Sequence, residues 1–512
     1  MKISKSKNNF LKLGLLAIFI GNCSTLNMAN ASVKYYDVST ALPRTIITTD
    51  PELDDLNSML RALLYSNEVN ISGLVISSSR FHYSGDDKSG VKPYRWYDPS
   101  HKSHIEMAID AYSKAYNNLK NHDKNYPSPK SLRELYRVGN IKNIGDMSED
   151  TPGSNLIKQI LLDDQDGQVF LQAWGGLNTI AKALASIQSE YSNSSEWPKI
   201  YEKVCKKAVI TSYGLQDSTY SEYIKPNWPD IQTREVKTNI WGYSGRRTVL
   251  PEDKVYFSKD WMQANVSSVG PMGSEYRVWG DGKQIAAGFD DEDYFGLPNM
   301  TKEQLEAKGY KVWMPPKETG SYISEGDSSN FALLINNGLD NWADPTWGGW
   351  GGRQSVDPAD NNHWSNATSQ DMAPDGTYPD GYFAARWWGD IQRDFAARLQ
   401  WTVHGSYSDA NHAPVVNVKE GNRVDASQGD VVKLTPITSD PDGNKVNTVL
   451  WQYKEAGTYA GTVELKKNDS GQWSMVIPES ANSGDTIHVI VESKDDGDPV
   501  MTRYQRVIVT VK

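Results

Sequence analysis

One short stretch near the N-terminus restricts the fold more than any other part of the chain. Residues 44–55 read RTIITTDPELDD, so an apolar strand runs into a turn that carries Asp50, Glu52, Asp54 and Asp55. Leucine and methionine then recur at helical spacing, which predicts an amphipathic helix directly after the turn. In open α/β sheets, ligands bind beyond the carboxyl ends of the strands. This turn therefore lies where a site is expected.

Two explanations fit these crowded carboxylates. Like charges at this spacing repel one another, and they are tolerated best around a bound cation or with a shared proton. Alternatively, acids collect at the start of a helix because the helix dipole favours them there. The dipole accounts for one or two acids but not for Asp50, which precedes the helix. The pattern favours a metal-binding or catalytic site, to which Asp50 and Asp55 supply carboxylates from one loop.

The order strand, turn, helix recurs along the chain and then gives way to alternating strands. The recurring order predicts an α/β domain over residues 38–405, with a mostly parallel sheet covered by helices. Short alternating runs separated by turns predict an immunoglobulin-like β-sandwich over residues 411–512. The main expected elements are strands at 45–48, 69–79, 169–174 and 208–213 and helices at 98–121, 153–162, 328–339 and 387–403.

The N-terminus has the pattern of a signal peptide, which we expect to span residues 1–31. Lysines precede an apolar run over residues 13–20, and an Ala-Asn-Ala sequence then offers a cleavage site. The run is too short to cross a bilayer, and no other segment suggests a membrane span. Cys23 provides only a weak lipoprotein signal, because the Asn before it fits the motif poorly. We expect an exported protein, periplasmic or extracellular.

The composition argues against a nucleic-acid ligand and favours a carbohydrate. A net charge of −11 argues against nucleic acid, whose binding proteins are usually basic. The 17 Trp and 27 Tyr residues suit a carbohydrate, because aromatic faces stack on sugar rings. Packing in the core is the alternative role for any of these side chains. The tryptophans considered for a sugar platform are Trp347, Trp350, Trp364, Trp387 and Trp388.

The acidic turn carries a family resemblance. The pattern Thr-Asp-Pro-x-x-Asp-Asp after an apolar strand resembles the N-terminal signature of nucleoside hydrolases. From about Pro43 to the C-terminus, the chain is similar to the nucleoside hydrolase-like, cellulose-binding protein family, including its small terminal domain. The resemblance implies that Asp50 is the catalytic base and a calcium ligand. It also implies that Asp55 holds the ion and that Asp54 binds sugar hydroxyls.

Later turns complete the implied site. In the Gly-Gly-Leu-Asn-Thr turn, Asn178 matches a residue whose main-chain carbonyl binds calcium. Asp327 matches an acid that binds both the ion and the sugar, although an ordinary N-cap would also explain it. Asn227 matches a sugar-binding Asn loosely, and His82 lies after a strand where another such Asn is expected. We therefore assign Asp54, Asn227, Asp327 and His82 to the substrate.

Several positions depart from the family pattern. Gly326 stands where nucleoside hydrolases have a histidine that would contribute to leaving-group chemistry, and Lys225 stands where they have an acid. Thr48 stands where Asp is usual, and residues 80–82 read Arg-Phe-His where a sugar-binding Asn is expected nearby. The last two changes indicate a site that keeps its metal and has altered its substrate. No Gly-x-Ser-x-Gly or His-Glu-x-x-His motif is present, and the 8 His residues give no support for a zinc site.

The leading hypothesis is an exported calcium-dependent hydrolase that cleaves glycosidic bonds of a plant or algal carbohydrate. Hydrolysis needs a water activated by a carboxylate and stabilisation of an oxocarbenium-like transition state. A carbohydrate-binding protein without catalysis, directed to cellulose, is the first alternative. An exported nucleoside hydrolase is the second.

Overall fold

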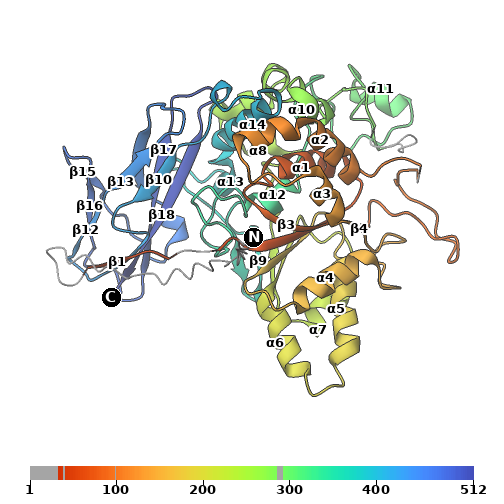
Figure 1. Cartoon of the computed structure of the whole chain (residues 1–512), viewed down its shortest axis with the longest axis horizontal. Helices are drawn as coiled ribbons and strands as arrows, with labels where there is room; N and C mark the ends of the chain where they lie inside the picture. Colours follow the sequence, from red (N-terminus) through yellow and green to blue (C-terminus); the bar gives the residue numbers. More distant parts are fainter. Residues whose placement is uncertain (1–32, 39–40, 99, 285–291) are drawn as a thin grey trace, which may run out of the picture.

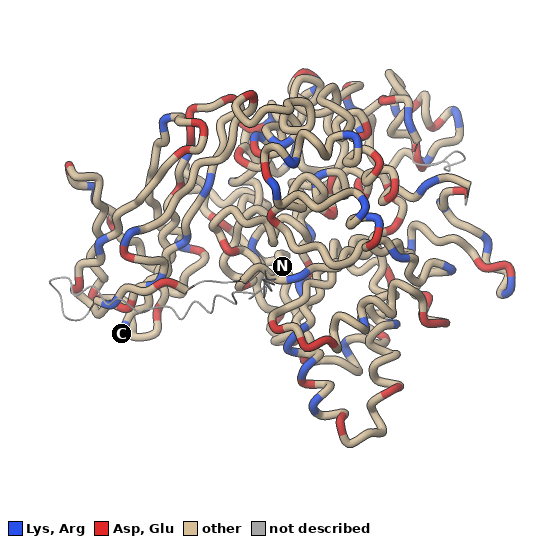
Figure 2. The backbone as a smooth tube through the Cα atoms, viewed as in Figure 1, with Lys and Arg blue, Asp and Glu red and all other residues tan. Residues whose placement is uncertain are grey.

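The computed structural model describes residues 33–38, 41–98, 100–284 and 292–512. The expected signal peptide and Cys23 lie outside the described residues. The described chain forms an α/β region built on an eight-stranded sheet and an all-β region beside it (Figure 1). Acidic and basic residues are mixed along both regions in the view of Figure 2. Where the chain is described, none of its helices has the length and hydropathy needed to cross a membrane.

The eight-stranded sheet has the order β4-β3-β2-β5-β6-β7-β9-β8. All neighbouring strands are parallel except the last pair, β9 and β8. β5 and β6 are buried throughout and β2 nearly so, as expected for parallel strands covered on both faces. Its strands are β2 (Arg44–Thr49), β3 (Asn70–Ile76), β4 (Tyr136–Val138), β5 (Val169–Ala173), β6 (Ala208–Ser212), β7 (Gln232–Glu235), β8 (Ser355–Asp357) and β9 (Asp360–Ser365).

Helices cover both faces of this sheet and form two separate apolar cores. One core joins β2 to α1, α2 and α14, with Leu60 and Phe395 among its members. The other joins β5 to α4, α5 and α6, with Ile180 and Val204 among its members. The long helices are α1 (Leu53–Leu64), α2 (His104–His122), α3 (Pro129–Leu135), α4 (Pro152–Leu162), α5 (Asn178–Tyr191), α6 (Trp197–Lys207) and α14 (Trp388–Val403).

Residues 220–332 contribute mostly short helices and turns. The short α-helices are α7 (Lys225–Asn227), α8 (Gly245–Thr248), α9 (Lys259–Met262), α10 (Gly270–Glu275), α11 (Lys302–Ala307), α12 (Ser328–Ala332) and, later, α13 (Tyr382–Ala385). The π-helical and 3-10 turns are η1 (Tyr220–Ile224), η2 (Pro251–Phe257), η3 (Gln263–Ser267), η4 (Tyr407–Asp409) and η5 (Lys454–Ala456).

The C-terminal region is all β, as predicted, and its sheets share one apolar core. The largest sheet has the order β1-β11-β18-β17-β14, and β11 runs parallel to β18 within it. The small sheets are β10-β13 and β12-β16-β15. The strands are β1 (Lys34–Tyr36), β10 (Val415–Val418), β11 (Arg423–Ala426), β12 (Val431–Leu434), β13 (Pro436–Ser439), β14 (Asn447–Gln452), β15 (Lys466–Lys467), β16 (Trp473–Val476), β17 (Thr486–Lys494) and β18 (Thr502–Val511).

Strand β1, near the N-terminus, belongs to a sheet of the C-terminal region. It precedes the α/β region in sequence, yet it pairs antiparallel with β11 of the C-terminal region, with Lys34 opposite Asp425. The expected elements did not include this strand, because three residues carry too little pattern to predict a partner. The expected division into residues 38–405 and 411–512 stays a prediction.

The helix expected over residues 328–339 is much shorter in the structure, where α12 ends at Ala332. The segment after α12 contacts the C-terminal region at residues 337 and 338. There, the Asn337 carbonyl accepts from the Tyr504 N–H at 2.9 Å, and the Gly338 carbonyl accepts from the Arg506 N–H at 3.0 Å. Gly338 has a φ of +88°, which ends helical geometry. Pairing with β18 therefore holds residues 337 and 338 outside the expected helix.

The tryptophans considered for a sugar platform have structural roles instead. Trp350 and Trp388 are fully buried, and Trp387 is only 2% exposed. Trp364 lies within the sheet, where β9 pairs with β7, and Trp347 packs edge-on against His488 with 5.6 Å between ring centroids. The platform hypothesis is wrong for the buried three. Trp387 packs against aromatic residues of the C-terminal region, and Trp388 packs against Trp241, Phe257 and Tyr322 within the α/β region.

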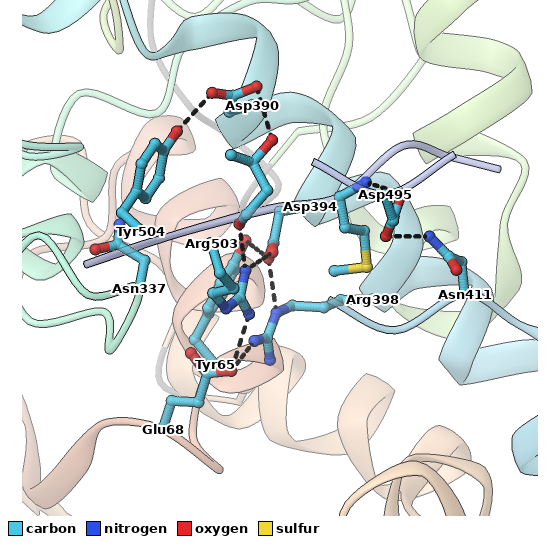
Figure 3. A network of polar contacts seen from close by, with 12 residues as sticks. Tyr65, Glu68, Asn337, Asp390, Asp394, Arg398, Asn411, Asp495, Arg503 and Tyr504 are labelled. Atoms are coloured by element: carbon cyan, nitrogen blue, oxygen red, sulfur yellow. Dashed lines mark hydrogen bonds and ion pairs between the residues drawn. The ribbon is translucent and has the colours of Figure 1, made fainter. Parts of the chain in front are cut away.

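A buried ionic network joins the two regions (Figure 3). Asp394 of α14 accepts hydrogen bonds from Arg398 (2.9 Å), Arg503 of β18 (2.6 Å) and the Tyr65 hydroxyl (2.6 Å). Glu68 pairs with the same two arginines. Burial by itself raises the pKa of Asp394, but the two guanidinium groups outweigh it and lower the pKa to about 2. Every charge in this network has an opposite partner.

Candidate metal and substrate site

The acidic turn lies beyond the carboxyl end of β2, between β3 and β5 near the middle of the sheet. Asp50 is fully buried, and Asp55 and Asp54 are 1% and 5% exposed. Glu52 occupies the N-cap position of α1, yet its side chain makes no capping hydrogen bond. Helix capping therefore does not explain the acids of this turn.

Asp327 reaches the same place from a turn far along the chain. The Gly326 N–H and the Ser324 hydroxyl donate to Asp54 Oδ2 at 3.3 Å and 2.9 Å, and these contacts fix the second turn against the first. Asp327 is 2% exposed and occupies the N-cap position of α12 without a side-chain capping bond. The ordinary N-cap explanation for Asp327 therefore lacks its defining contact.

Two overlapping sets of side chains at this turn lie close enough to hold a cation. Candidate ligand atoms of Asp50, Glu52 and His82 lie within 4.8 Å of one another, and so do those of Glu52, Asp54 and Asp55. Two carboxylate oxygens in this group, Asp50 Oδ1 and Asp327 Oδ1, are buried without a hydrogen-bond partner. Within the described ranges, no Lys or Arg forms an ion pair with any of the four aspartates. Buried oxygens without partners fit a hard cation, which binds oxygen ligands.

Burial and mutual repulsion shift the ionisation of these acids. Burial raises the pKa of Asp50 to about 6, against the opposing charge of His82. Burial and the neighbouring Glu52 carboxylate raise the pKa of Asp54 to about 8. The pKa values of Asp55 and Asp327 are also raised well above the ordinary range, by burial first and then by the nearby aspartates. A divalent cation would reverse these shifts by supplying the missing positive charge.

His82 and Glu52 form a pair at the edge of the cluster. His82 Nδ1 hydrogen-bonds to the Arg95 carbonyl at 2.7 Å, and Nε2 lies 3.7 Å from Glu52 Oε2. Burial alone would lower the pKa of His82, but Glu52 and Asp50 outweigh it and raise the pKa. The pKa of Glu52 is lowered in spite of its burial, because His82 and Arg95 favour its charged form. The sequence singled out Glu52 as an acid but assigned it no role.

The glycine turn after β5 fits closely against Asp50. The Ser79 hydroxyl donates to Asp50 Oδ2 at 2.5 Å, which orients the carboxylate. A Cβ atom on Gly175 would lie 2.5 Å from Asp50 Oδ1, so a larger residue there would displace the carboxylate. The Gly-Gly sequence at this strand end was therefore a usable signal for the site.

Asn178 connects the turns around the site with its side chain. Its Oδ1 accepts from the Ser77 hydroxyl at 2.9 Å, and its Nδ2 donates to the Asn140 carbonyl at 2.8 Å. Its main-chain N–H donates to Asp217 Oδ2 at 3.0 Å. These contacts make Asn178 a support for three neighbouring turns. Its assignment as a carbonyl ligand stays a prediction.

The structure does not bring Asn227 to the cluster. Its Oδ1 accepts from Gln188 Nε2 at 3.3 Å, and its Nδ2 donates to the Tyr223 carbonyl at 2.9 Å. Gln188 lies ten residues beyond the start of α5, about 15 Å along that helix from the turn that faces the site. Asn227 therefore belongs to the packing of α5 against α7, and we leave it out of the substrate site.

A cavity of about 470 Å³ opens over the acids. Glu52, Asp54 and Asp327 line it together with two tyrosines, Tyr213 and Tyr243. Sequence reasoning missed both tyrosines, although Tyr213 directly follows β6 and the strand-end rule would have found it. Tyr243 comes from an irregular segment in which no sequence pattern indicates the fold.

A parallel sheet with buried aspartates beyond a central strand defines an α/β protein of the nucleoside hydrolase-like class. The chain belongs to the family described as cellulose-binding Sde182, nucleoside hydrolase-like domain, which matches residues 44–354. Residues 432–511 match the family described as cellulose-binding protein Sde0182, C-terminal domain. Both matches confirm the resemblance seen in the acidic turn and in the terminal domain.

Solved structures extend the comparison. A nucleoside hydrolase-related hypothetical protein from Saccharophagus degradans, described as associated with carbohydrate metabolism, is 24% identical. It covers 92% of this chain and 100% of its own, with a TM-score of 0.68, which shows a common fold. An endo-fucoidan hydrolase of glycoside hydrolase family 107 is 10% identical over 92% of this chain and 80% of its own, with a TM-score of only 0.17. No curated protein matches the sequence.

Proposed function

We propose that this protein is an exported, calcium-dependent hydrolase that cleaves glycosidic bonds of a plant or algal carbohydrate. One observation carries the proposal: buried aspartates from two distant turns meet beneath a cavity, with Asp50 Oδ1 and Asp327 Oδ1 left without partners. The cellulose-binding description of the family supports a carbohydrate as the substrate. The expected signal peptide supports export to the periplasm or beyond.

Asp50, Asp55 and Asp327 would hold the cation, and the Asn178 carbonyl is the further ligand that the family resemblance implies. Calcium takes six to eight oxygen ligands with flexible geometry, which suits this donor set better than zinc. When bound, it would offset the repulsion among the carboxylates and lower the pKa of an attached water.

In the proposed reaction, Asp50 accepts a proton from the attacking water while the water oxygen bonds to the anomeric carbon. The bond from that carbon to the leaving oxygen breaks, and the leaving oxygen takes up a proton from solvent, to which Asp50 later returns the proton it accepted. Asp54 and Asp327 accept hydrogen bonds from sugar hydroxyls and stabilise the positive charge that develops on the ring. His82 is fully buried and lies against Glu52, which lines the cavity, so its proposed role toward the substrate is through Glu52.

The test is a screen of the purified protein against oligosaccharides, insoluble cellulose and nucleosides, with added calcium or with a chelator. We expect calcium-dependent release of sugar, and a loss of about 100-fold or more in Asp50→Ala, the size of a general-base contribution. Asp469→Asn, at an exposed site, is the matched control.

Each other outcome assigns a different function. Retention on cellulose without release would identify a non-catalytic carbohydrate-binding protein. Release of free base from nucleosides would identify a nucleoside hydrolase. Asp50→Ala with the rate of the wild type would show that Asp50 is not the base.

A further inference from the structure

A second cavity of about 500 Å³ adjoins the acidic one. Glu52 and Phe81 line both cavities, so the two cavities adjoin and share part of one wall. The volume of the second cavity falls in the range of about 300–1,000 Å³ that small-molecule sites occupy. The remaining wall residues are Arg95, Glu292, Lys311, Val312 and Trp313.

Trp313 provides an open aromatic face in this cavity. It is 48% exposed, and it is the only tryptophan among the exposed large apolar residues of the described chain. Its ring packs edge-on against Tyr243 (4.8 Å between centroids, 80°) and Phe295 (5.5 Å, 72°). This packing holds the indole in place and leaves one face to the cleft. A ligand that stacks there does not have to order the ring.

Tyr243 connects the aromatic face to the acids. Its ring supports Trp313, and its hydroxyl lies 3.5 Å from Glu52 Oε1 in the acidic cavity. Phe81, which is 41% exposed, faces both cavities from the turn after β3. A ligand long enough to reach from the acids to Trp313 would therefore contact aromatic surface along its length.

The charges around the second cavity balance. Glu292 lies 3.7 Å from Arg95 and 3.7 Å from Lys311, and Glu52 contributes the second acid to two bases. Arg95 and Lys311 already pair with a carboxylate, so this cavity does not favour a phosphate. A purely apolar ligand would leave the charged groups unsolvated. An aromatic face bordered by paired charges matches a neutral ring with many hydroxyls, which presents a C–H face and hydrogen-bonding edges.

We propose that this second cavity binds the sugar next to the one held by the aspartates, with a pyranose ring stacked on Trp313. The protein would thus grip at least two consecutive sugars of a glycan chain. This subsite rests on the proposed function of the acidic cavity. In this proposal, Trp313 provides the sugar platform that the sequence analysis considered for tryptophans that are buried.

The test compares the Asp50→Ala protein, which lacks the proposed base and one proposed calcium ligand, with the same protein carrying Trp313→Ala. Binding of glucose and of the cello-oligosaccharide series up to cellohexaose is measured by calorimetry. We expect Trp313→Ala to raise the Kd for the oligosaccharides about tenfold, within the energy of one aromatic stack, and to leave glucose unchanged. Trp313→Phe should recover part of the loss. Tyr378→Ala, which removes an aromatic residue 57% exposed outside both cavities, is the control.

Several results would overturn the subsite. They are an unchanged oligosaccharide affinity in Trp313→Ala, an equal loss in Tyr378→Ala, and no binding of any cello-oligosaccharide by the parent protein. Tighter Trp313-dependent binding of inosine than of sugars would make the cavity a base pocket instead. Calcium-induced stabilisation is measured in parallel on both proteins and on the wild type. If calcium stabilises the wild type while the sugars fail, the subsite alone is wrong. If sugars bind through Trp313 but calcium has no effect on the wild type, the proposed metal-dependent function is wrong.

Discussion

Two groups of buried acids in this protein are built in opposite ways. At the junction of the two regions, Asp394 and Glu68 face Arg398 and Arg503 (Figure 3). Beyond β2, the aspartates face one another, and no described Lys or Arg forms an ion pair with them. A buried carboxylate without a counter-charge is costly, so the second group is stable only if something else compensates it. This difference separates a charge-balanced structural network from a cluster of acids that could hold a metal ion.

The two groups also respond to pH with opposite signs. Asp394 has a folded pKa of about 2, below the unfolded value near 3.9, so its contribution is present at neutral pH and is lost as pH falls toward 2. Asp50 and Asp54 have folded pKa values of about 6 and about 8. Their ionisation therefore destabilises the metal-free protein progressively as pH rises from about 4 to about 8.

The largest expected effect comes from breaking the paired group. Asp394→Asn leaves two buried guanidinium groups short of a carboxylate, and we expect a loss of about 3 kcal/mol in the free energy of unfolding. Urea denaturation at pH 7 measures it, with Asp469→Asn as the exposed control. A loss below about 1 kcal/mol would mean that Asp394 is not important for the junction.

Calcium should act on the unpaired group alone. At a concentration 100-fold above its Kd, a ligand of the folded state stabilises the protein by about 2.7 kcal/mol. We expect calcium to raise the Tm of the wild type and of Asp394→Asn by similar amounts, but not that of Asp327→Asn. If Asp327→Asn retains the full shift, the ion is bound elsewhere.

Neutralising one unpaired acid should stabilise the protein in the absence of metal. We expect Asp54→Asn to gain at least about 1 kcal/mol at pH 8, since each unit of raised pKa is worth about 1.4 kcal/mol. The gain should vanish near pH 4, where Asp54 is largely protonated in the wild type. Thermal unfolding in chelator at both pH values measures it, and a loss of stability at pH 8 would contradict the inferred repulsion.

The smallest effect is expected outside both groups. Asn227→Ala removes one hydrogen bond to Gln188 of α5 and one to the Tyr223 carbonyl of η1, with a cost of about 1 kcal/mol. Calcium-induced stabilisation and any sugar release should be unchanged, which the assays above test directly. A loss of sugar release in this variant would return Asn227 to the substrate site.

Some parts of the site were predictable because their signals are local. The strand before Asp50 and the helix after it follow from apolar spacing within a dozen residues. The positions of Asp50, Asp54 and Asp55 at a strand end follow from that pattern and the α/β order. Asp327 followed only from the family resemblance, since its turn is 272 residues from Asp54.

Other features of the fold and the site depend on contacts between residues far apart in the sequence, which no local pattern predicts. His82 gains its raised pKa from Glu52, and Trp313 gains its orientation from Tyr243. The helix expected over residues 328–339 ends at Ala332, and the segment after it pairs with β18 through the Asn337 and Gly338 carbonyls. In each case the deciding contact comes from a different segment of the chain.

The sequence by itself determined the α/β order, the all-β C-terminal region and the acids at the end of the first sheet strand. Periodicity and turn chemistry act over a few residues, so they can be read along the chain. The tertiary structure decided which acids lack a counter-charge, which tryptophans are buried and which one faces the cleft. Burial and charge pairing depend on what packs against each side chain, and that is settled only when distant segments meet.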